Sequence, residues 1–257
     1  MAAAKGLLAP IVGIVYRGLN NLGALSFLLL ALALAWREQR RLKPLAPEGS
    51  RPFNMWLYML CVAPSYCFLL GGVYLLGYLM VHPGCMAVYV GGVLVFIPMM
   101  LGLALFFPHN GAPARQLELL MPGLALQQFF NRMACTMAAG CCYGIPCRFG
   151  IVFPDTAWPS IAFGRGTRVF PSQPLEAAVM LLCFAALLWL LLRGKRILPV
   201  FPLTFGLTGF VLEFLSGESK GYILLGMNLQ QWGYALVLCI GVIFLFFPRK
   251  EPQPGLV

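Results

Sequence analysis

Charged residues are scarce in this sequence. Lysine, arginine, aspartate and glutamate together make up 10% of the 257 residues, whereas 60% are hydrophobic, and a soluble domain carries about 25% charged residues. The composition therefore excludes a soluble globular protein and predicts an integral membrane protein. Acidic residues are fewest, at 8 against 18 basic ones, and the basic residues lie between apolar segments. This placement does not predict nucleic-acid binding; it is typical of loops that orient a membrane protein and contact anionic lipid.

Histidine is rarer still, with only two in the chain. His82 and His109 both lie apart from the densest cysteine group, Cys141, Cys142 and Cys147. Zinc sites combine cysteine and histidine at short, regular spacings, and this group has no such spacing. We therefore expect no metal and no other cofactor. A disulfide is an alternative for these cysteines if they lie on an external, oxidising face.

Long apolar runs are what the sequence has in abundance. A helix needs roughly 20 residues to cross a hydrocarbon core of about 30 Å. The predicted spans are Asn20–Trp36, Met55–Met80, Cys85–Phe107, Leu117–Ala139, Pro174–Leu192, Val200–Leu215 and Leu229–Phe247. No cleavable signal segment is recognisable before the first run, which is expected to act as its own signal. The sequence thus predicts an all-α integral membrane protein of about seven transmembrane helices, with residues 1–257 forming a single membrane domain.

The distribution of basic residues predicts how the chain crosses the membrane. They gather after the first, third, fifth and seventh spans, as Arg37, Arg40, Arg41, Lys43, Arg51, Arg115, Arg193, Lys195, Arg196, Arg249 and Lys250. Positively charged loops stay cytoplasmic, so the N-terminus is expected outside and the C-terminus inside. Residues 140–173 then form an external loop or small subdomain between spans 4 and 5. A connection of that length is uncommon without a function.

One arginine and one glutamate lie inside these apolar runs. Arg132 interrupts the fourth span, and an arginine at the centre of a membrane costs roughly 2.5–3.5 kcal/mol on insertion scales. Its guanidinium is expected to bind a lipid phosphate or a buried acid, with snorkelling to the interface as the alternative. Glu213 lies in the sixth span with no basic neighbour in sequence, which makes Arg132 its predicted partner. We expect both to face one interior cavity, and a purely structural buried pair is the alternative.

Two further groups of polar residues flank the fifth span. Ser172 and Glu176 have the spacing of a helix cap, although Glu176 also lies at the edge of an otherwise uncharged run. In the preceding loop, Arg148 and Arg168 either contact phosphate headgroups or are ordinary interfacial residues.

Three motifs, in the right order, resemble the prolipoprotein diacylglyceryl transferase family. The fourth span and the residues after it resemble the family's signature helix and loop, through Leu117-Glu118, Pro122-Gly123-Leu124-Ala125-Leu126, Arg132 and Gly140 to Gly144. The family's His-Pro-Ser-Gln-x-Tyr-Glu motif is matched by Pro171-Ser172-Gln173 and Glu176. Its Tyr-Gly and Arg-x-x-x-Glu-Phe segment is matched by Phe205-Gly206 and Glu213-Phe214, and Gln231 fits a recurring glutamine near the last span.

The chain departs from the family pattern at several of these positions. Phe170 stands where the family has histidine, Leu175 and Phe205 where it has tyrosine, and Cys135 where it has asparagine. Gly209 occupies the place of the family's arginine, four residues before Glu213. The fold implied by the resemblance survives these changes, whereas the activity it implies is weakened.

The resemblance implies a bacterial plasma-membrane enzyme that moves a diacylglyceryl group from phosphatidylglycerol to the lipobox cysteine of a prolipoprotein signal peptide. Catalytic roles then fall to Arg132 and Glu213. The residues implied to bind substrate are Arg148, Arg168, Ser172, Gln173, Glu176, Gln231 and Gly144. The alternative is an inactive family member that binds lipid or a membrane-protein partner. A neighbouring arginine in place of the one missing at Gly209 would favour the enzyme, and an empty, uncharged pocket there would favour the binder.

The predicted orientation can be tested by cysteine-accessibility labelling of the first loop. A single cysteine placed between Arg37 and Arg51 is expected to react with a membrane-impermeant thiol reagent only after the membrane is opened, because positive loops stay cytoplasmic. Labelling of that cysteine in intact cells would contradict the seven-span orientation.

Overall fold

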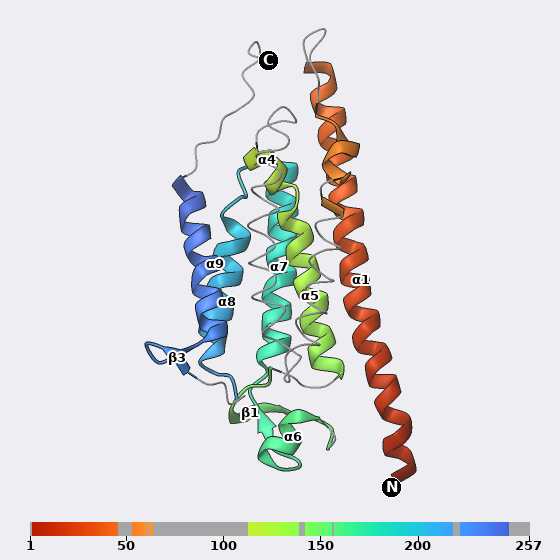
Figure 1. The fold of residues 1–257 in the computed structure, drawn as a ribbon, viewed down its shortest axis with the longest axis vertical. Helices are drawn as coiled ribbons and strands as arrows, with labels where there is room; N and C mark the ends of the chain where they lie inside the picture. The colour runs from red at the N-terminus through yellow and green to blue at the C-terminus, as the bar shows by residue number, and fades with distance from the viewer. Residues whose placement is uncertain are drawn as a thin grey trace.

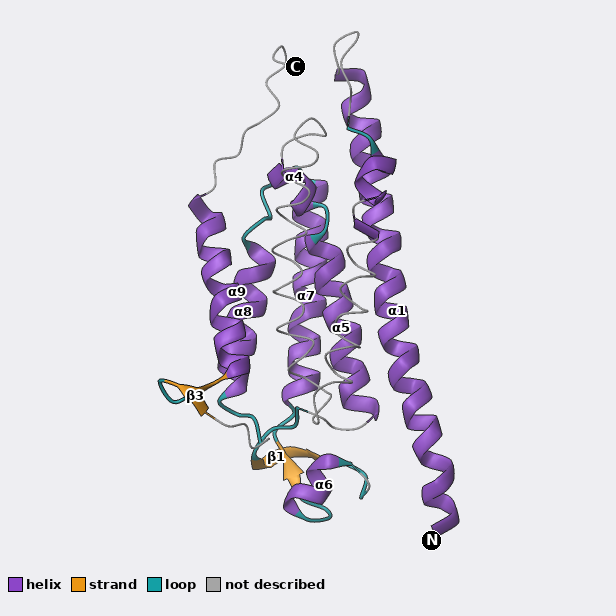
Figure 2. Ribbon diagram, viewed as in Figure 1, coloured by secondary structure: helices purple, strands orange, loops and turns teal. Residues whose placement is uncertain are grey.

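The computed structural model describes residues 2–45, 53–60, 62–63, 113–138, 142–155, 157–217 and 222–246. Most of them are helical, and the strands are short (Figure 2). The helices are α1 (Ala2–Leu42), α4 (Pro113–Glu118), α5 (Met121–Ala138), α6 (Trp158–Phe163), α7 (Ser172–Leu192), α8 (Val200–Glu213) and α9 (Leu229–Phe246), with a short 3₁₀ turn at Lys43–Leu45. The strands are β1 (Pro146–Val152), β2 (Arg168–Val169), β3 (Tyr222–Leu224) and β4 (Met227–Asn228).

The long helices lie side by side in the order α1, α5, α7, α8, α9, each packed on the next (Figure 1). Two stretches in the described part of the chain are long and apolar enough to cross a membrane, Ile14–Leu42 and Ser172–Leu192, and α8 and α9 are apolar but shorter. At about 1.5 Å per residue, α7 alone is about as long as a hydrocarbon core is thick. The predicted span Cys85–Phe107 and most of Met55–Met80 lie outside the described residues, so the count of seven stays a prediction.

The prediction of a mostly helical protein is confirmed, but short strands are also present. The described residues contain two small antiparallel sheets, in which β1 pairs with β2 and β3 pairs with β4. The first sheet and α6 enclose a small core of their own, made by Tyr143, Phe153, Ala157 and Val169. This β1–α6–β2 unit occupies the stretch predicted as an external loop or small subdomain, at the end of the bundle where α1 begins (Figure 1). The hairpin of β3 and β4 joins α8 to α9 at the same end.

The predicted fourth span is two helices rather than one. A turn at Leu119 and Leu120 separates α4 from α5, and Pro122 explains it. Proline has no backbone N–H to donate, and its ring clashes with the carbonyl four residues earlier, here that of Glu118. The first helix therefore ends at Glu118.

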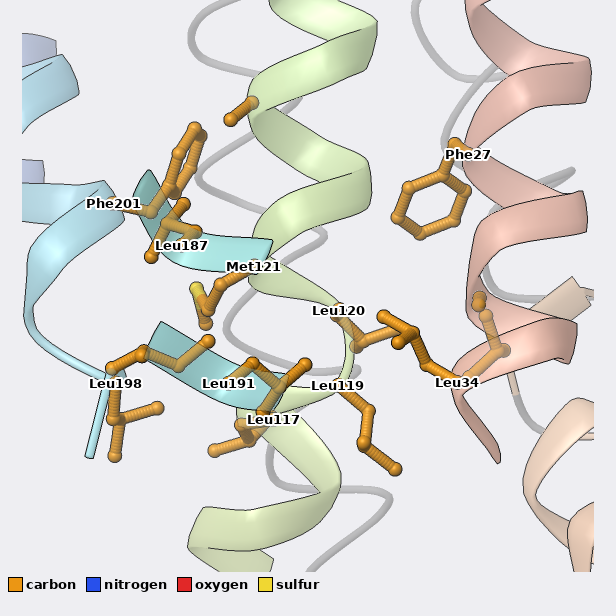
Figure 3. Packing of buried hydrophobic residues seen from close by; sticks show 14 of the residues in the cluster. Phe27, Leu34, Leu117, Leu119, Leu120, Met121, Leu187, Leu191, Leu198 and Phe201 are labelled. Atoms are coloured by element: carbon orange, nitrogen blue, oxygen red, sulfur yellow. The ribbon is translucent and has the colours of Figure 1, made fainter. Parts of the chain in front are cut away.

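Between the helices, the core is built from large aliphatic and aromatic side chains. Figure 3 shows Phe27 of α1 facing α5 and Leu34 of α1 beside Leu120 in the α4–α5 turn. It also shows Leu187 and Leu191 of α7 beside Leu198 and Phe201. Gly123 on α5 makes the approach of α1 possible, because a Cβ there would lie 2.8 Å from Cδ2 of Phe27. Small residues at helix contacts allow this close packing in membrane proteins.

A cluster of charges ties α1 to α4 at the other end of the bundle. Arg115 holds Glu38 with two hydrogen bonds, Nε to Oε1 at 3.0 Å and Nη2 to Oε2 at 3.1 Å. Its Nη1 donates to Oε2 of Glu118 at 2.9 Å, and the other oxygen of Glu118 accepts the backbone N–H of Ile197 at 3.0 Å. Burial alone would lower the pKa of Arg115, but the two carboxylates outweigh burial and raise that pKa above its ordinary value.

This cluster predicts a large loss of stability when its arginine is removed. Arg115→Ala leaves the buried Glu118 without its cation and removes the two hydrogen bonds to Glu38, and breaking such a buried pair typically costs about 3–5 kcal/mol. Thermal unfolding of the purified protein in detergent measures the loss. Arg41→Ala is the matched control, because Arg41 also contacts Glu38, at 3.2 Å, but is 46% exposed. Such exposed pairs contribute about 1 kcal/mol at most. Equal melting temperatures for the two variants would contradict this view of the cluster.

Candidate functional site

Arg132 is buried and paired. It lies on α5 and is 3% exposed, so it does not snorkel to the membrane surface. Its Nε lies 2.9 Å from Oε1 of Glu176 on α7, and its Nη2 donates to the hydroxyl of Tyr234 on α9 at 2.9 Å. One guanidinium thus joins three helices. A buried charge needs a partner of opposite sign, and the structure supplies Glu176, whereas the sequence argument had named Glu213.

Arg132, Glu176 and Glu213 line one cavity of about 20 Å³, which has room for about one water molecule. The other lining residues are Cys142, Ser172, Gly209, Leu212, Ser216, Gln230 and Tyr234. The prediction that Arg132 and Glu213 face the same cavity is therefore confirmed. The cavity is formed by the ends of α7, α8 and α9 that lie next to the β1–α6–β2 unit (Figure 1).

The start of α9 holds Glu213 in place. Asn228 and Gln231 exchange hydrogen bonds across the first turn, each side-chain oxygen accepting the backbone N–H of the other at 2.9 Å. This reciprocal arrangement is a capping box, and it fixes the side chain of Asn228. The amide of Asn228 then donates to Oε1 of Glu213 at 2.9 Å. The oxygen of Gln231, which the resemblance assigned to substrate, is used in this cap.

The start of α7 does not use the cap that the sequence suggested. Ser172 is the first helical residue, Pro171 precedes it without a capping side chain, and the Ser172 hydroxyl donates to the Cys142 carbonyl at 3.0 Å. That hydrogen bond joins the loop residue Cys142 to the start of α7.

Cys142 is disulfide-bonded and Cys147 is a free thiol, whereas Cys141 lies outside the described residues. Gln173 is also buried at this end, 1% exposed, but is not among the residues that line the cavity.

Gly144 lies where the loop crosses the end of α8. It forms an antiparallel bridge with Ser216, and its neighbours bond to the same segment, Ile145 N–H to the carbonyl of Leu215 and Gly217 N–H to that of Tyr143. A Cβ at position 144 would lie 2.5 Å from the carbonyl oxygen of Phe170. Only glycine fits this crossing, so the visible role of Gly144 is to join the loop to the bundle.

Arg148 and Arg168 are not part of the cavity lining. They lie on β1 and β2, both exposed, and Arg168 donates to the carbonyl of Gly150 at 3.4 Å. Phe149, next to Arg148 on β1, is 93% exposed. These residues therefore belong to the surface of the β1–α6–β2 unit.

The position of the missing arginine is filled by a tyrosine that the sequence argument did not select. A Cβ on Gly209 would lie 1.9 Å from Cε1 of Tyr234, so the ring occupies the space in front of this glycine. The structure thus shows neither a replacement arginine among the described cavity residues nor an empty pocket. In sequence, a tyrosine within an apolar run cannot be distinguished from any other core aromatic residue. The only signal was the pair of glycines at 206 and 209, one turn apart on α8, which indicates that large side chains of another helix pack against this face.

The fold and site together define a mostly helical membrane protein with a buried, charged cavity at one end of its bundle. The chain belongs to the prolipoprotein diacylglyceryl transferase family, whose model matches residues 22–247. It is 28% identical over 145 residues to a phosphatidylglycerol–prolipoprotein diacylglyceryl transferase of Clostridium tetani, covering 54% of this chain and 55% of that protein. It is 30% identical over 157 residues to phosphatidylglycerol–prolipoprotein diacylglyceryl transferase 2 of Clostridium perfringens, covering 58% of each. The matches thus span little more than half the length of these relatives, and no solved structure matches significantly.

The crossing at Gly144 predicts a specific sensitivity to one methyl group. Gly144→Ala is expected to destabilise the protein by about 2 kcal/mol or more, because the Cβ meets backbone that cannot move freely. Gly233→Ala on α9 is the control, since a Cβ there meets nothing within 4 Å and alanine favours the helix. Thermal unfolding of both variants measures the difference in their stability. A Gly144→Ala protein as stable as the unmutated one would show that the crossing tolerates a side chain.

Proposed function

We propose that this protein transfers a diacylglyceryl group from phosphatidylglycerol to a cysteine thiol of a prolipoprotein. The observation that carries the proposal is the buried Arg132, 2.9 Å from Glu176, in a cavity that Glu213 also lines. Family membership and the names of the two clostridial relatives support the choice of substrates. Transfer from a phospholipid needs a cation for the phosphate and a base for the thiol, and this cavity offers both.

The reaction forms one bond and breaks one. The cysteine sulfur attacks the glyceryl carbon that carries the phosphate ester, a carbon–sulfur bond forms, and the bond from that carbon to the phosphate oxygen breaks. Glycerol phosphate leaves with the bonding electrons, and the thiol proton must go to a base. A free thiol has a pKa near 8.5, so a base is needed to produce the thiolate at neutral pH.

Glu213 is the better placed base of the two carboxylates. Glu176 lies 2.9 Å from the guanidinium of Arg132, so its visible role is to hold that cation. Glu213 accepts a hydrogen bond from the neutral amide of Asn228 and lines the cavity. In this assignment Arg132 stabilises the departing phosphate, Glu176 orients Arg132, and Asn228 orients Glu213.

The charges of the cavity also link removal of the thiol proton to departure of the phosphate. The charged side chains among the described residues of the cavity are one guanidinium and two carboxylates, Arg132, Glu176 and Glu213. A phosphate entering this cavity brings further negative charge, which is costly in a low-dielectric site. Transfer of the thiol proton to Glu213 removes one negative charge at the moment when charge develops on the departing phosphate.

We further propose a bacterial plasma-membrane location with the N-terminus outside and the C-terminus cytoplasmic. Basic residues in the last turn of α1, Arg40 and Arg41, and at the end of α7, Arg193, support it. Those helix ends lie together at one end of the bundle, with the end of α9, opposite the β1–α6–β2 unit (Figure 1). Positive charge there fits the cytoplasmic side and would place the cavity toward the exterior, where prolipoprotein signal peptides emerge.

Gly209 favours a second candidate function. A family member without the expected arginine has one cation fewer to bind the phosphate. Loss of such a residue is expected when a family member loses its catalytic activity during evolution. Such a protein would bind phosphatidylglycerol or a membrane-protein partner without chemistry. Complementation of a bacterium depleted of its own diacylglyceryl transferase separates the two: growth supports the enzyme, and failure of a well-expressed, membrane-inserted protein supports the binder.

Replacement of Arg132 is expected to abolish most transfer. Removal of one charge-stabilising donor commonly costs about 10²–10³ in rate, so Arg132→Ala should lose at least that much. Arg132→Lys keeps the charge but loses the planar guanidinium. Its activity should therefore lie between that of the unmutated protein and that of Arg132→Ala. The assay is lipid transfer to a lipobox peptide by each purified variant.

The control for that assay is a cysteine of the protein itself. Cys239 is a free, exposed thiol, and Cys239→Ser should keep full activity because the nucleophilic thiol belongs to the substrate. Full activity in Arg132→Ala, or its loss in a well-folded Cys239→Ser, would contradict the mechanism.

A further inference from the structure

We propose that Tyr234 is a positioning residue for Arg132, and that position 209 is glycine because the ring of Tyr234 occupies its side-chain space. The two positions act as a pair: Gly209 admits the ring, and the hydroxyl of the ring fixes the guanidinium. This inference deepens the proposed transferase function and rests on it.

The steric part of the argument concerns the contact between α8 and α9. A Cβ on Gly209 would lie 1.9 Å from Cε1 and 2.3 Å from both Cδ1 and Cζ of Tyr234. These distances are far below van der Waals contact, so no other residue is compatible with the ring in this place. On α8, Phe205 meets the ring at an edge-on angle, with centroids 5.5 Å apart. The ring is therefore confined to one position between these two residues.

The polar part concerns the guanidinium. Tyr234 is 3% exposed, and its hydroxyl lies 2.9 Å from Nη2 of Arg132. Glu176 contacts the same guanidinium at a different nitrogen, Nε. Contacts at two nitrogens from two helices restrict both the position and the tilt of the planar group. A catalytic cation displaced by about 1 Å loses about 10² in rate, so the tilt matters for chemistry.

The ring of Tyr234 also differs in charge from the residue that the family pattern has at position 209. The family's arginine would extend a second cation into the space now held by the ring. A phenol supplies a hydrogen-bond partner at the same place without charge. The chain therefore holds its buried cation with one carboxylate and one neutral hydroxyl.

Tyr234→Phe keeps the ring and removes only the hydroxyl. We expect kcat for lipid transfer to fall about ten-fold and KM for phosphatidylglycerol to rise, because the guanidinium proposed to meet the phosphate loses one of the hydrogen bonds that fix it. Tyr58→Phe is the matched control. Tyr58 is also a buried tyrosine, 1% exposed, whose hydroxyl donates to the carbonyl of Gln116 at 3.1 Å, outside the cavity. It should lower the melting temperature without lowering kcat, and an unchanged kcat in Tyr234→Phe would overturn the proposal.

The pairing itself is tested by exchanging the two positions. Gly209→Arg alone should be inactive because its Cβ collides with the ring, and Tyr234→Ala alone should be impaired because Arg132 loses its hydrogen bond to the tyrosine hydroxyl. The double variant Gly209→Arg with Tyr234→Ala removes the collision, and we expect it to exceed the better single variant at least ten-fold. A double variant no more active than the single ones would show that the two positions are not coupled.

Failure of the proposed function can be distinguished from failure of this inference. If the unmutated protein transfers no lipid, the transferase assignment falls, and the role of Tyr234 is measured by binding. Phosphatidylglycerol, but not phosphatidylcholine, should then raise the melting temperature of the unmutated protein and of Tyr58→Phe. Loss of that shift in Tyr234→Phe supports the positioning role, and an equal shift overturns it.

Discussion

The burial of one guanidinium organises this end of the molecule. Arg132 on α5 is closed off from the surroundings, and an unpaired charge there would cost more than most single interactions contribute. Glu176 on α7 and Tyr234 on α9 meet its requirement, so three helices must converge on one point. The cavity, the approach of α8 to α9 at Gly209 and the crossing at Gly144 all lie around that point, and each constrains where the chain can run.

Apolar run length predicted the bundle well because crossing a membrane imposes it. The observed α7, α8 and α9 begin within two residues of the predicted spans, and Arg132 with Glu213 could be placed in one cavity because two intramembrane charges must share surroundings. The partner of Arg132 could not be chosen from sequence, since Glu176 follows Ser172 at the spacing of a helix cap. Asn228, which holds Glu213, also lacked a signal, because a capping asparagine looks the same whether or not its amide reaches a second residue.

The strands of the small β1–α6–β2 unit could not be predicted from the sequence for a different reason. β2 has only two residues, too few to show the alternation of polar and apolar side chains that identifies a strand. Its form depends instead on contacts between distant backbone segments, such as the bridge between Gly144 and Ser216 and the bond from Phe170 N–H to the carbonyl of Ile145. Gly144 could be identified in the sequence as part of a motif. Its contact with the Phe170 carbonyl could not be predicted, because the two residues are far apart along the chain.

The two ends of the bundle show how a functional site differs from a structural ion cluster of similar composition. At one end, Arg115 contacts both Glu38 and Glu118, and the remaining oxygen of Glu118 accepts a backbone N–H, so these charges are used to join helices. At the other end, Arg132 pairs with Glu176, while Glu213 is held by a neutral amide and faces a cavity. The two ends therefore differ in what surrounds the charges. Neutral side chains, Asn228 and Tyr234, contact Glu213 and Arg132 beside the cavity, and the proposed transfer depends on this arrangement.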